Sequence, residues 1–250
     1  MNIKIIGEGY PIVMLHGWAM NLKIFEPFVE LFNIKKYKFI LINLPDMHDE
    51  MIWDEVIEEI DGSLKKISIK EFDLFGWSLG GQIAIDIYLK NKKLVNQLYL
   101  VATTPQFVNS EQWKLGLEKN IFENFSTGIL SDSKKTLNKF FNLQLIGQES
   151  KKDLLNFLDS NVSKEKINIS SLHNYLKHME TKNYNNALEQ ISCQVNLISG
   201  KKDKIVPIES QYELLKMIKN KRHLFIDEAS HIPFLSHAVH CKSFMMRNYE

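Results

Sequence analysis

The sequence predicts an α/β fold in which helices flank a mostly parallel central sheet. Six short apolar runs are bounded by glycine, proline or aspartate, which is typical of buried strands. Amphipathic segments separate most of these runs, as helices separate the strands of a parallel sheet. A third observation is a long stretch with helical patterns only, which indicates an insertion into this fold.

The expected elements follow from these patterns in chain order. The strands are PIVMLHG (11–17), YKFILINLP (37–45), FDLFGWS (72–78), NQLYLVATTP (96–105), CQVNLISGKKD (193–203) and KRHLFIDEASH (221–231). The helices between and after them are KIFEPFVELF (23–32), IWDEVIEEIDGSLKKI (52–67), LGGQIAIDIYLKN (79–91) and IESQYELLKMIKN (208–220).

The region from about residue 108 to residue 188 contains no apolar run of the strand type. It contains the helical patterns EQWKLGLEKNIFENF, DSKKTLNKFFNLQLIG, ESKKDLLNFLDSN and ISSLHNYLKHMETKN. A structureless loop of this length would be improbable inside a compact domain. We therefore expect a helical cap over 108–188, inserted into an α/β core made of 1–107 and 189–250.

Composition excludes several classes of protein. The chain has 31 basic and 30 acidic residues, so its net charge of +1 gives no reason to expect nucleic-acid or membrane-surface binding. No apolar run approaches the roughly 18 residues that a membrane-spanning helix needs, and the first residues lack a signal-peptide pattern. Cys193 and Cys241 suggest neither a disulfide framework nor a metal site, so we expect free thiols in the cytoplasm.

The stretch LFGWSLGG (74–81) places Ser78 between Gly76 and Gly80, where an expected strand ends and a helix begins. A Gly-x-Ser-x-Gly sequence at such a turn predicts a nucleophile elbow. The glycines are needed because the strand and the helix approach too closely for a Cβ atom. The turn exposes the serine hydroxyl beside the positive end of the helix dipole. Ser78 is therefore the expected nucleophile.

A serine hydroxyl is a weak nucleophile until a histidine takes its proton and a carboxylate orients that histidine. After such an elbow the acid precedes the histidine in the chain. Asp203 follows the fifth expected strand and His231 the sixth, so both reach the sheet edge where Ser78 lies. The alternatives are Asp227, within the sixth strand segment, and His48, in the loop after the second strand. Among the other histidines, we expect His223 to point into packing, His173 and His178 to lie on a cap helix, and His237 and His240 to lie on the last helix.

Acyl transfer also requires hydrogen-bond donors for the negative charge that develops on the carbonyl oxygen. LHGWAMN (15–21) ends the first expected strand, and its His-Gly turn can aim the backbone N–H of Trp18 at this oxygen. The second expected donor is the backbone N–H of Leu79, which follows the nucleophile.

These motifs together carry a resemblance to a known family. LHGW, GWSLGG, the order Ser–Asp–His and a helical cap resemble the α/β-hydrolase superfamily. LHGWAMN, GWSLGGQIA, VATTPQF, FFNLQLIG and ASHIPFLSH resemble, more narrowly, the methyl ester carboxylesterases that act on pimeloyl-[acyl-carrier protein] in biotin synthesis. The resemblance runs nearly from end to end. It implies the α/β-hydrolase fold, a cytoplasmic serine esterase, and no metal or organic cofactor.

The resemblance also implies a set of substrate contacts and a partner. The residues implied to bind substrate are Trp18, Ser78, Leu79, His231 and the cap residues Phe140, Phe141, Asn142, Leu143 and Gln144. The partner is an acyl-carrier protein that bears the pimeloyl methyl ester, and we expect the esterase itself to be a monomer. Its relatives use arginines on the cap where this chain has Lys135, Lys139 and Lys152, which we expect to receive the acidic carrier protein. Asn156 stands at a further such position and is uncharged.

One segment departs from the family pattern. Many relatives have a glycine-rich turn after the second strand, whereas this chain has NLPDMHDE with Asp46 in place of the first glycine. The shape of the loop at 45–50 is therefore open. Two other functions also stay open at this point: a general short-chain carboxylesterase or thioesterase, and a non-catalytic ligand-binding protein.

Overall fold

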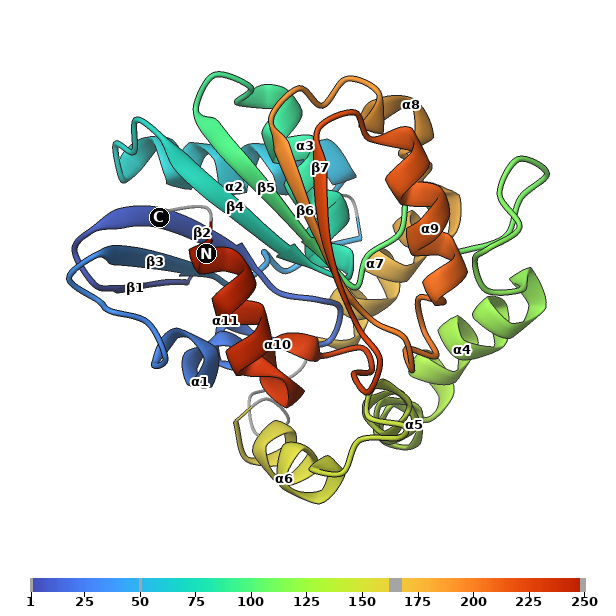
Figure 1. Ribbon diagram of the computed structural model, residues 1–250. Coiled ribbons are helices and arrows are strands. Elements are labelled where there is room, and N and C mark those ends of the chain that lie inside the picture. Colours follow the sequence, from blue (N-terminus) through green and yellow to red (C-terminus); the bar gives the residue numbers. More distant parts are fainter. Residues whose placement is uncertain (1, 50, 162–167, 248–250) are drawn as a thin grey trace.

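A single sheet of seven strands forms the centre of the molecule in the computed structural model, which describes residues 2–49, 51–161 and 168–247 (Figure 1). Its spatial order is β1-β3-β2-β4-β5-β6-β7. The strands are β1 Ile3–Ile6, β2 Tyr10–Leu15, β3 Tyr37–Ile42, β4 Phe72–Trp77, β5 Val95–Val101, β6 Gln194–Gly200 and β7 Lys221–Ile226. β1 pairs antiparallel with β3, and all other pairings are parallel. The predicted α/β fold with a mostly parallel sheet is confirmed.

β1 is the strand that the sequence patterns did not predict. It has only four residues, and both ends are half-buried while its centre is exposed. A short edge strand of this kind has no continuous apolar run to reveal it. It pairs with β3 from Ile3 opposite Ile42 to Ile6 opposite Phe39, and so covers one edge of the sheet.

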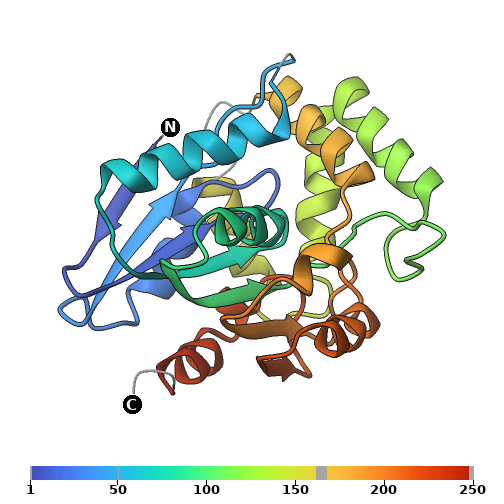
Figure 2. The same ribbon diagram turned by 90° about the horizontal axis from the view of Figure 1, so that it is seen from above.

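Helices cover both faces of the sheet (Figures 1 and 2). α2 and α3 lie on one face, and α1 and α11 lie on the other. The bounds of the core helices are η1 Leu22–Phe25, α1 Glu26–Val29, α2 Trp53–Lys66, α3 Leu79–Lys90, α9 Ile208–Met217, α10 Pro233–Ser236 and α11 Ala238–Met246. No helix in the described ranges is long and apolar enough to cross a membrane.

The segment between β5 and β6 is helical and lies past the carboxyl ends of the parallel strands (Figure 1). It contains α4 Lys119–Ser131, α5 Ser133–Gln144, α6 Lys151–Asn161, α7 Ile169–Thr181 and α8 Asn185–Leu188. The first helix starts later than the pattern from residue 111 indicates, because Val108 forms a β-bridge with Leu117. Residues 162–167 of the expected cap lie outside the described residues. The division into cap and core stays a prediction.

An aromatic cluster packs η1 and α10 against β4. All six residues of β4 are buried. Phe75 of β4 contacts Phe25 of η1 and Phe234 of α10, with ring centroids 5.7 and 5.9 Å apart. Trp77, at the end of β4, also contacts Phe234 at 5.3 Å. This packing fixes the position of α10, which directly follows the loop that carries His231.

Candidate active site

Ser78 occupies a strained turn between β4 and α3. Its φ of 55° and ψ of −120° lie in a region that residues with a Cβ atom rarely adopt. The surrounding structure holds this conformation: the Ser78 N–H donates to the carbonyl of Val101, and its carbonyl accepts from the Thr103 hydroxyl at 2.7 Å. A Cβ atom on Gly76 would lie 2.3 Å from the carbonyl oxygen of Gly80, which shows how closely the strand and the helix approach.

Asp203 and His231 lie side by side after β6 and β7. His231 Nδ1 and Asp203 Oδ2 are 2.7 Å apart, and both side chains are almost fully buried. The other carboxylate oxygen of Asp203 accepts from the backbone N–H groups of Ile205 and Val206 at 2.8 and 3.0 Å. With both oxygens engaged, the carboxylate has one orientation and holds the imidazole with a proton on Nδ1.

The loop of His231 is also attached to the strand that carries Ser78. The indole N–H of Trp77 donates to the carbonyl of His231 at 2.9 Å, and the two rings are 5.6 Å apart. Nε2 of His231 has no hydrogen-bond partner among the described residues, so it is not bonded to the Ser78 hydroxyl. Such bonds are often long in structures without substrate and shorten when substrate binds.

The alternative acid and base occupy different surroundings. Asp227 is exposed and forms an ion pair with Lys201, with 2.7 Å between Oδ1 and Nζ. His48 lies exposed in the loop after β3. The expectation that His223 points into packing is wrong: β7 is the last strand of the sheet, and His223 is exposed beside Phe225.

Three of the remaining histidines, His173, His178 and His240, lie on the helices expected for them, whereas His237 lies in the turn between α10 and α11. His173 and His178 are on α7, where burial lowers the pKa of both imidazoles, to about 4 for His178. His237 precedes α11 and His240 lies within it.

The segment after β2 passes directly beside the nucleophile. A Cβ atom on Gly17 would lie 3.2 Å from the Cβ of Ser78. The buried His16 fixes this segment: its Nδ1 is 2.8 Å from the Gly17 carbonyl, and its Nε2 is 3.0 Å from the Leu44 N–H. Since Nε2 must accept from Leu44, Nδ1 donates to Gly17, and the imidazole is neutral. Sequence reasoning gave His16 no role of its own, and the signal for it was its place in the His-Gly turn.

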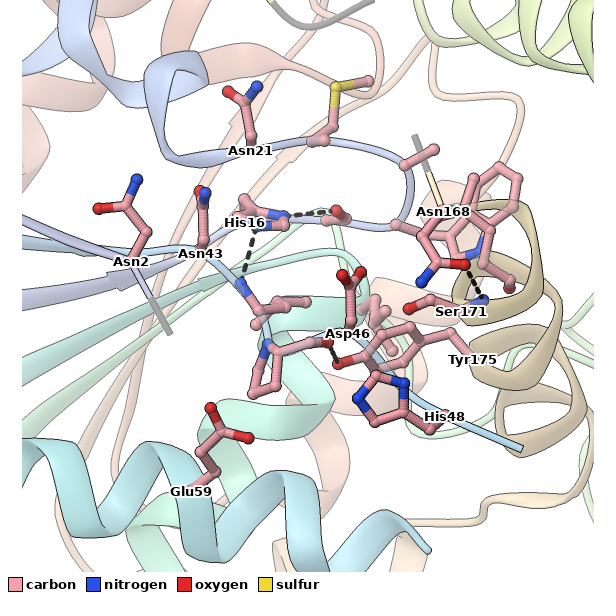
Figure 3. A pocket seen from close by; sticks show the side chains of 18 residues that line it. Asn2, His16, Asn21, Asn43, Asp46, His48, Glu59, Asn168, Ser171 and Tyr175 are labelled. Atoms are coloured by element: carbon pink, nitrogen blue, oxygen red, sulfur yellow. Dashed lines mark hydrogen bonds between the residues drawn. The ribbon is translucent and has the colours of Figure 1, made fainter. Parts of the chain in front are cut away.

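Trp18 and Leu79, the expected oxyanion donors, both adjoin the nucleophile in the chain or in space: Trp18 follows Gly17, which lies beside Ser78, and Leu79 follows Ser78 directly. Leu79 is the first residue of α3, so its backbone N–H has no acceptor within the helix. Both residues line a polar cavity of about 480 Å³ next to the turn (Figure 3). The indole of Trp18 faces the helical segment: its N–H donates to the Leu172 carbonyl at 2.9 Å. Its ring makes edge contacts with Phe125 and Phe140 at 5.2 and 4.9 Å.

A second, mainly apolar cavity of about 630 Å³ extends from Ser78 between the helices of the inserted segment. Of the residues implied to bind substrate, Trp18, Ser78, Phe140 and Leu143 line it. Phe141 and Gln144 are buried but are not among its lining residues. Asn142 lines an adjoining open groove instead.

Two of the three predicted docking lysines line this cavity. Lys135 and Lys139 line both the 630 Å³ cavity and the open groove on α5. Lys152 is exposed on α6, the next helix. Lys135 and Lys139 thus line the same cavity as Ser78.

The loop after β3, whose shape the sequence left open, is held by α7. Ser171 accepts a hydrogen bond from the Met47 N–H, and Asn174 donates to the Met47 carbonyl. Tyr175 donates to the Pro45 carbonyl at 2.7 Å; its side chain projects into the cavity of Figure 3. Hydrogen bonds from Asn174 and Ser170 lower the pKa of Asp49. Side-chain bonds to a helix therefore define this loop without the usual glycine-rich turn.

Metal-binding residues do not gather at this site. Within the ranges that the structure describes, no group of three or more His, Cys, Asp or Glu side chains could hold a metal ion.

The fold, the elbow and the Asp–His pair define a hydrolase class, and a family model agrees: the chain belongs to the α/β-hydrolase fold family, matched over residues 10–238. Among curated proteins, it is similar to the pimeloyl-[acyl-carrier protein] methyl ester esterase of Nitrosomonas europaea. The two are 30% identical over 240 residues, which cover 94% of each chain. The protein of the same name from Wigglesworthia glossinidia brevipalpis is 30% identical over 249 residues, which cover 96% of this chain and 94% of that one.

Solved structures give the same fold. An esterase from Exiguobacterium antarcticum superposes with a TM-score of 0.89 at 20% identity, covering 98% of this chain and 94% of that one. A bromoperoxidase from Bacillus anthracis superposes with a TM-score of 0.88 at 19% identity, covering 98% and 93%. The family model and the curated relatives show the family. The solved structures are at most 20% identical, so they show the fold alone.

Replacing Gly80 by alanine should destabilise the protein strongly. The new Cβ atom would lie 2.2 Å from the Leu15 carbonyl oxygen, so the strand or the helix must move. We expect a loss of about 3 kcal/mol in the free energy of unfolding, measured by urea denaturation. Gly62→Ala is the matched control, because nothing lies within 4 Å of its Cβ position in α2. It should stabilise by about 0.5–1 kcal/mol. Equal effects of the two substitutions would contradict the close approach at the elbow.

Proposed function

We propose that this protein is a serine carboxylesterase that hydrolyses the methyl ester of pimeloyl-[acyl-carrier protein] and releases methanol, as a step of biotin synthesis. The observation that carries the chemistry is the 2.7 Å Asp203–His231 pair beside the strained Ser78 turn. The observation that carries the substrate is the similarity to curated esterases of that name over almost the whole chain.

In the proposed acylation, His231 Nε2 removes the proton from the Ser78 hydroxyl while Oγ attacks the ester carbonyl carbon. Asp203 keeps the other proton on Nδ1 and stabilises the imidazolium that forms. The tetrahedral intermediate collapses, the bond to the methoxy oxygen breaks, and His231 returns its proton to that oxygen. Methanol leaves and an ester between Ser78 and the pimeloyl group remains.

The backbone N–H groups of Trp18 and Leu79 are the proposed donors to the oxyanion. The N–H of Leu79 begins α3, so the helix dipole adds to the stabilisation there. His16 holds the turn before Trp18 through hydrogen bonds to Gly17 and Leu44, which supports a first donor that is fixed before substrate binds. Donors fixed in advance need no reorganisation as the charge develops.

Deacylation uses the same groups with water in place of the serine hydroxyl. His231 takes a proton from water, which attacks the ester carbonyl, and then gives the proton to Ser78 Oγ. The products are the free pimeloyl carboxylate, still joined to its carrier, and the original serine. These steps use side chains and water alone, so we propose no metal or organic cofactor.

The 630 Å³ cavity is the proposed site of the acyl chain. It is mainly apolar and runs from Ser78 past Phe140 and Leu143 to Lys135 and Lys139 at its mouth. A chain threaded along it would bring its terminal methyl ester to Ser78 while its other end stays outside. An acidic carrier protein would then lie against the lysines.

The setting proposed for the enzyme is the cytoplasm, with the acyl-carrier protein as partner and without stable self-association. Its two cysteines, Cys193 and Cys241, are free thiols, which suits a reducing compartment. Complementation of a biotin auxotroph that lacks the esterase would test the cellular role directly, with Ser78→Ala as the negative control.

Ser78→Ala should abolish ester hydrolysis while the fold persists. Loss of the nucleophile removes the covalent route, and activity should fall by at least about 10³-fold. The measurement is turnover of the carrier-bound methyl ester, with circular dichroism to check the fold. A serine-directed phosphonate should label the native protein and not the variant. Labelling of neither would favour a non-catalytic binding protein.

Asp203→Asn should reduce turnover by about 10⁴-fold with little change in KM, because asparagine favours the wrong imidazole tautomer. Asp227→Asn is the matched control: Asp227 is exposed and pairs with Lys201 only at the surface. Steady-state kinetics on one ester compare the two variants. If Asp227→Asn were the damaging substitution, the proposed acid would be wrong.

Replacing Lys135, Lys139 and Lys152 together by glutamate should impair the carrier-bound substrate selectively. Attraction for the acidic carrier becomes repulsion, so kcat/KM should fall by about 10–100-fold at low salt, mainly through the association rate. The loss should shrink at 1 M salt, where the Debye length is about 3 Å. Hydrolysis of p-nitrophenyl acetate should be nearly unchanged.

The control for this charge reversal changes Lys35, Lys36 and Lys219, which are exposed and precede β3 and β7 at the opposite end of the strands. It alters the net charge equally and should leave both activities near those of the native protein. An equal loss of kcat/KM in the two triple variants would show an effect of net charge alone and would contradict docking at Lys135, Lys139 and Lys152. No loss in either would favour a general short-chain esterase.

A further inference from the structure

The end of α5 is hydrogen-bonded to the loop that carries His231. The backbone N–H of His231 donates to the Gln144 carbonyl at 3.2 Å. The Ser230 hydroxyl donates to the same carbonyl at 2.8 Å. The Gln148 side chain donates to the Glu228 carbonyl at 2.8 Å. Three bonds thus join the turn at 144–148 to residues 228–231, which we call the histidine loop.

These bonds are shielded from water. Gln144, Ser230 and His231 are at most 1% exposed, and Gln148 is 8% exposed. A hydrogen bond without competing water is costly to lose, because the buried partner is left unsatisfied. The same turn also lies against the loop of the acid: a Cβ atom on Gly147 would lie 3.1 Å from the Lys202 side chain. Lys202 in turn pairs with Glu228 of the histidine loop.

The backbone of His231 is therefore held from two sides. Its carbonyl accepts from Trp77 of the core, and its N–H donates to Gln144 of α5. Asp203 fixes the orientation of the His231 ring. The distance from Nε2 to Ser78 then depends on the position of the His231 backbone. Since Nε2 has no partner among the described residues, this distance is not fixed by a bond to the serine.

The same helix contacts the proposed substrate path. α5 carries Lys135 and Lys139 at the mouth of the 630 Å³ cavity and Phe140 along its wall, and it ends at Gln144. A helix of this length moves as a nearly rigid body, so a shift at the lysine end reaches the carbonyl of Gln144. A misplacement of about 1 Å between reacting groups can cost about 10²-fold in rate.

We infer that the 144–148 turn and Ser230 form a positioning element for His231. Through the three bonds, α5 sets the distance between the base and Ser78, and the helix that receives substrate also places the group that activates the nucleophile. Gln148 and Ser230 act through His231 and touch neither substrate nor the reacting atoms. This inference rests on the proposed esterase function.

The test removes the bonds without touching the proposed catalytic groups. Ser230→Ala deletes one donor, and Gln148→Met keeps the length of the side chain but deletes the other. Each single variant should lower kcat on p-nitrophenyl acetate by about threefold to tenfold, and the double variant by about 10–100-fold. KM should stay within about twofold, because the bonds act on the base and not on ester binding.

Ser236→Ala is the matched control. Its hydroxyl bonds to the Ile232 carbonyl one turn back and makes no contact with α5 that the structure records. Its kcat should equal that of the native protein. Thermal unfolding checks that each variant is folded at the assay temperature. If the double variant does not fold, Gln148→Met alone still tests the inference, because Gln148 lies at the edge of the contact.

Two results would overturn the inference. One is an unchanged kcat in the folded Gln148→Met and double variants, even if their Tm falls, since the bonds would then be structural only. The other is an equal loss in Ser236→Ala. A native protein that hydrolyses neither p-nitrophenyl acetate nor the carrier-bound ester would instead contradict the proposed function, so the two failures are distinguishable.

Discussion

The close approach of β4 and α3 is the constraint on which the rest of the structure depends. β4 is buried along its whole length, and only Ser78 separates it from α3. This is possible only because Gly76 and Gly80 leave room for neighbouring backbone atoms. The turn imposes a positive φ on Ser78 and places the N-terminus of α3 directly after this residue. The strain at Ser78, the position of its side chain at the cavity and the nearby helix dipole thus have a single steric origin.

The order of the strands explains why the Asp–His pair forms independently of Ser78. β6 and β7 are neighbours in the sheet, so the loops that follow them meet directly and Asp203 reaches His231. β4 is separated from β6 by β5. His231 follows β7, so its loop must extend back across the ends of β6 and β5 toward the serine, which needs support from outside its own strand. Trp77 supplies part of that support from the core.

Much of this could be predicted from the sequence, and the reason is that the signals are local. Apolar runs and glycine spacing fixed the six parallel strands, the elbow at Ser78 and the strand ends where Asp203 and His231 lie. β1 was missed because four residues at an edge carry too little pattern, and His223 was misjudged because a pattern does not reveal that its strand is the last in the sheet. The path of the loop after β3 also escaped prediction. It depends on Ser171, Asn174 and Tyr175, which are more than a hundred residues away.

The joints between the inserted helices and the core have a consequence for how such proteins could be recombined. Three of the core segments that are hydrogen-bonded to this insertion are Trp18, which is bonded to Leu172, the loop after β3, which is bonded to α7, and the histidine loop, which is bonded to the end of α5. A transplant of these helices onto another hydrolase scaffold would cut all three joints at once. The insertion is therefore not an interchangeable module, and a working chimera must inherit matching residues on both sides of each boundary. Substrate preference and core sequence are expected to change together when this lineage diversifies.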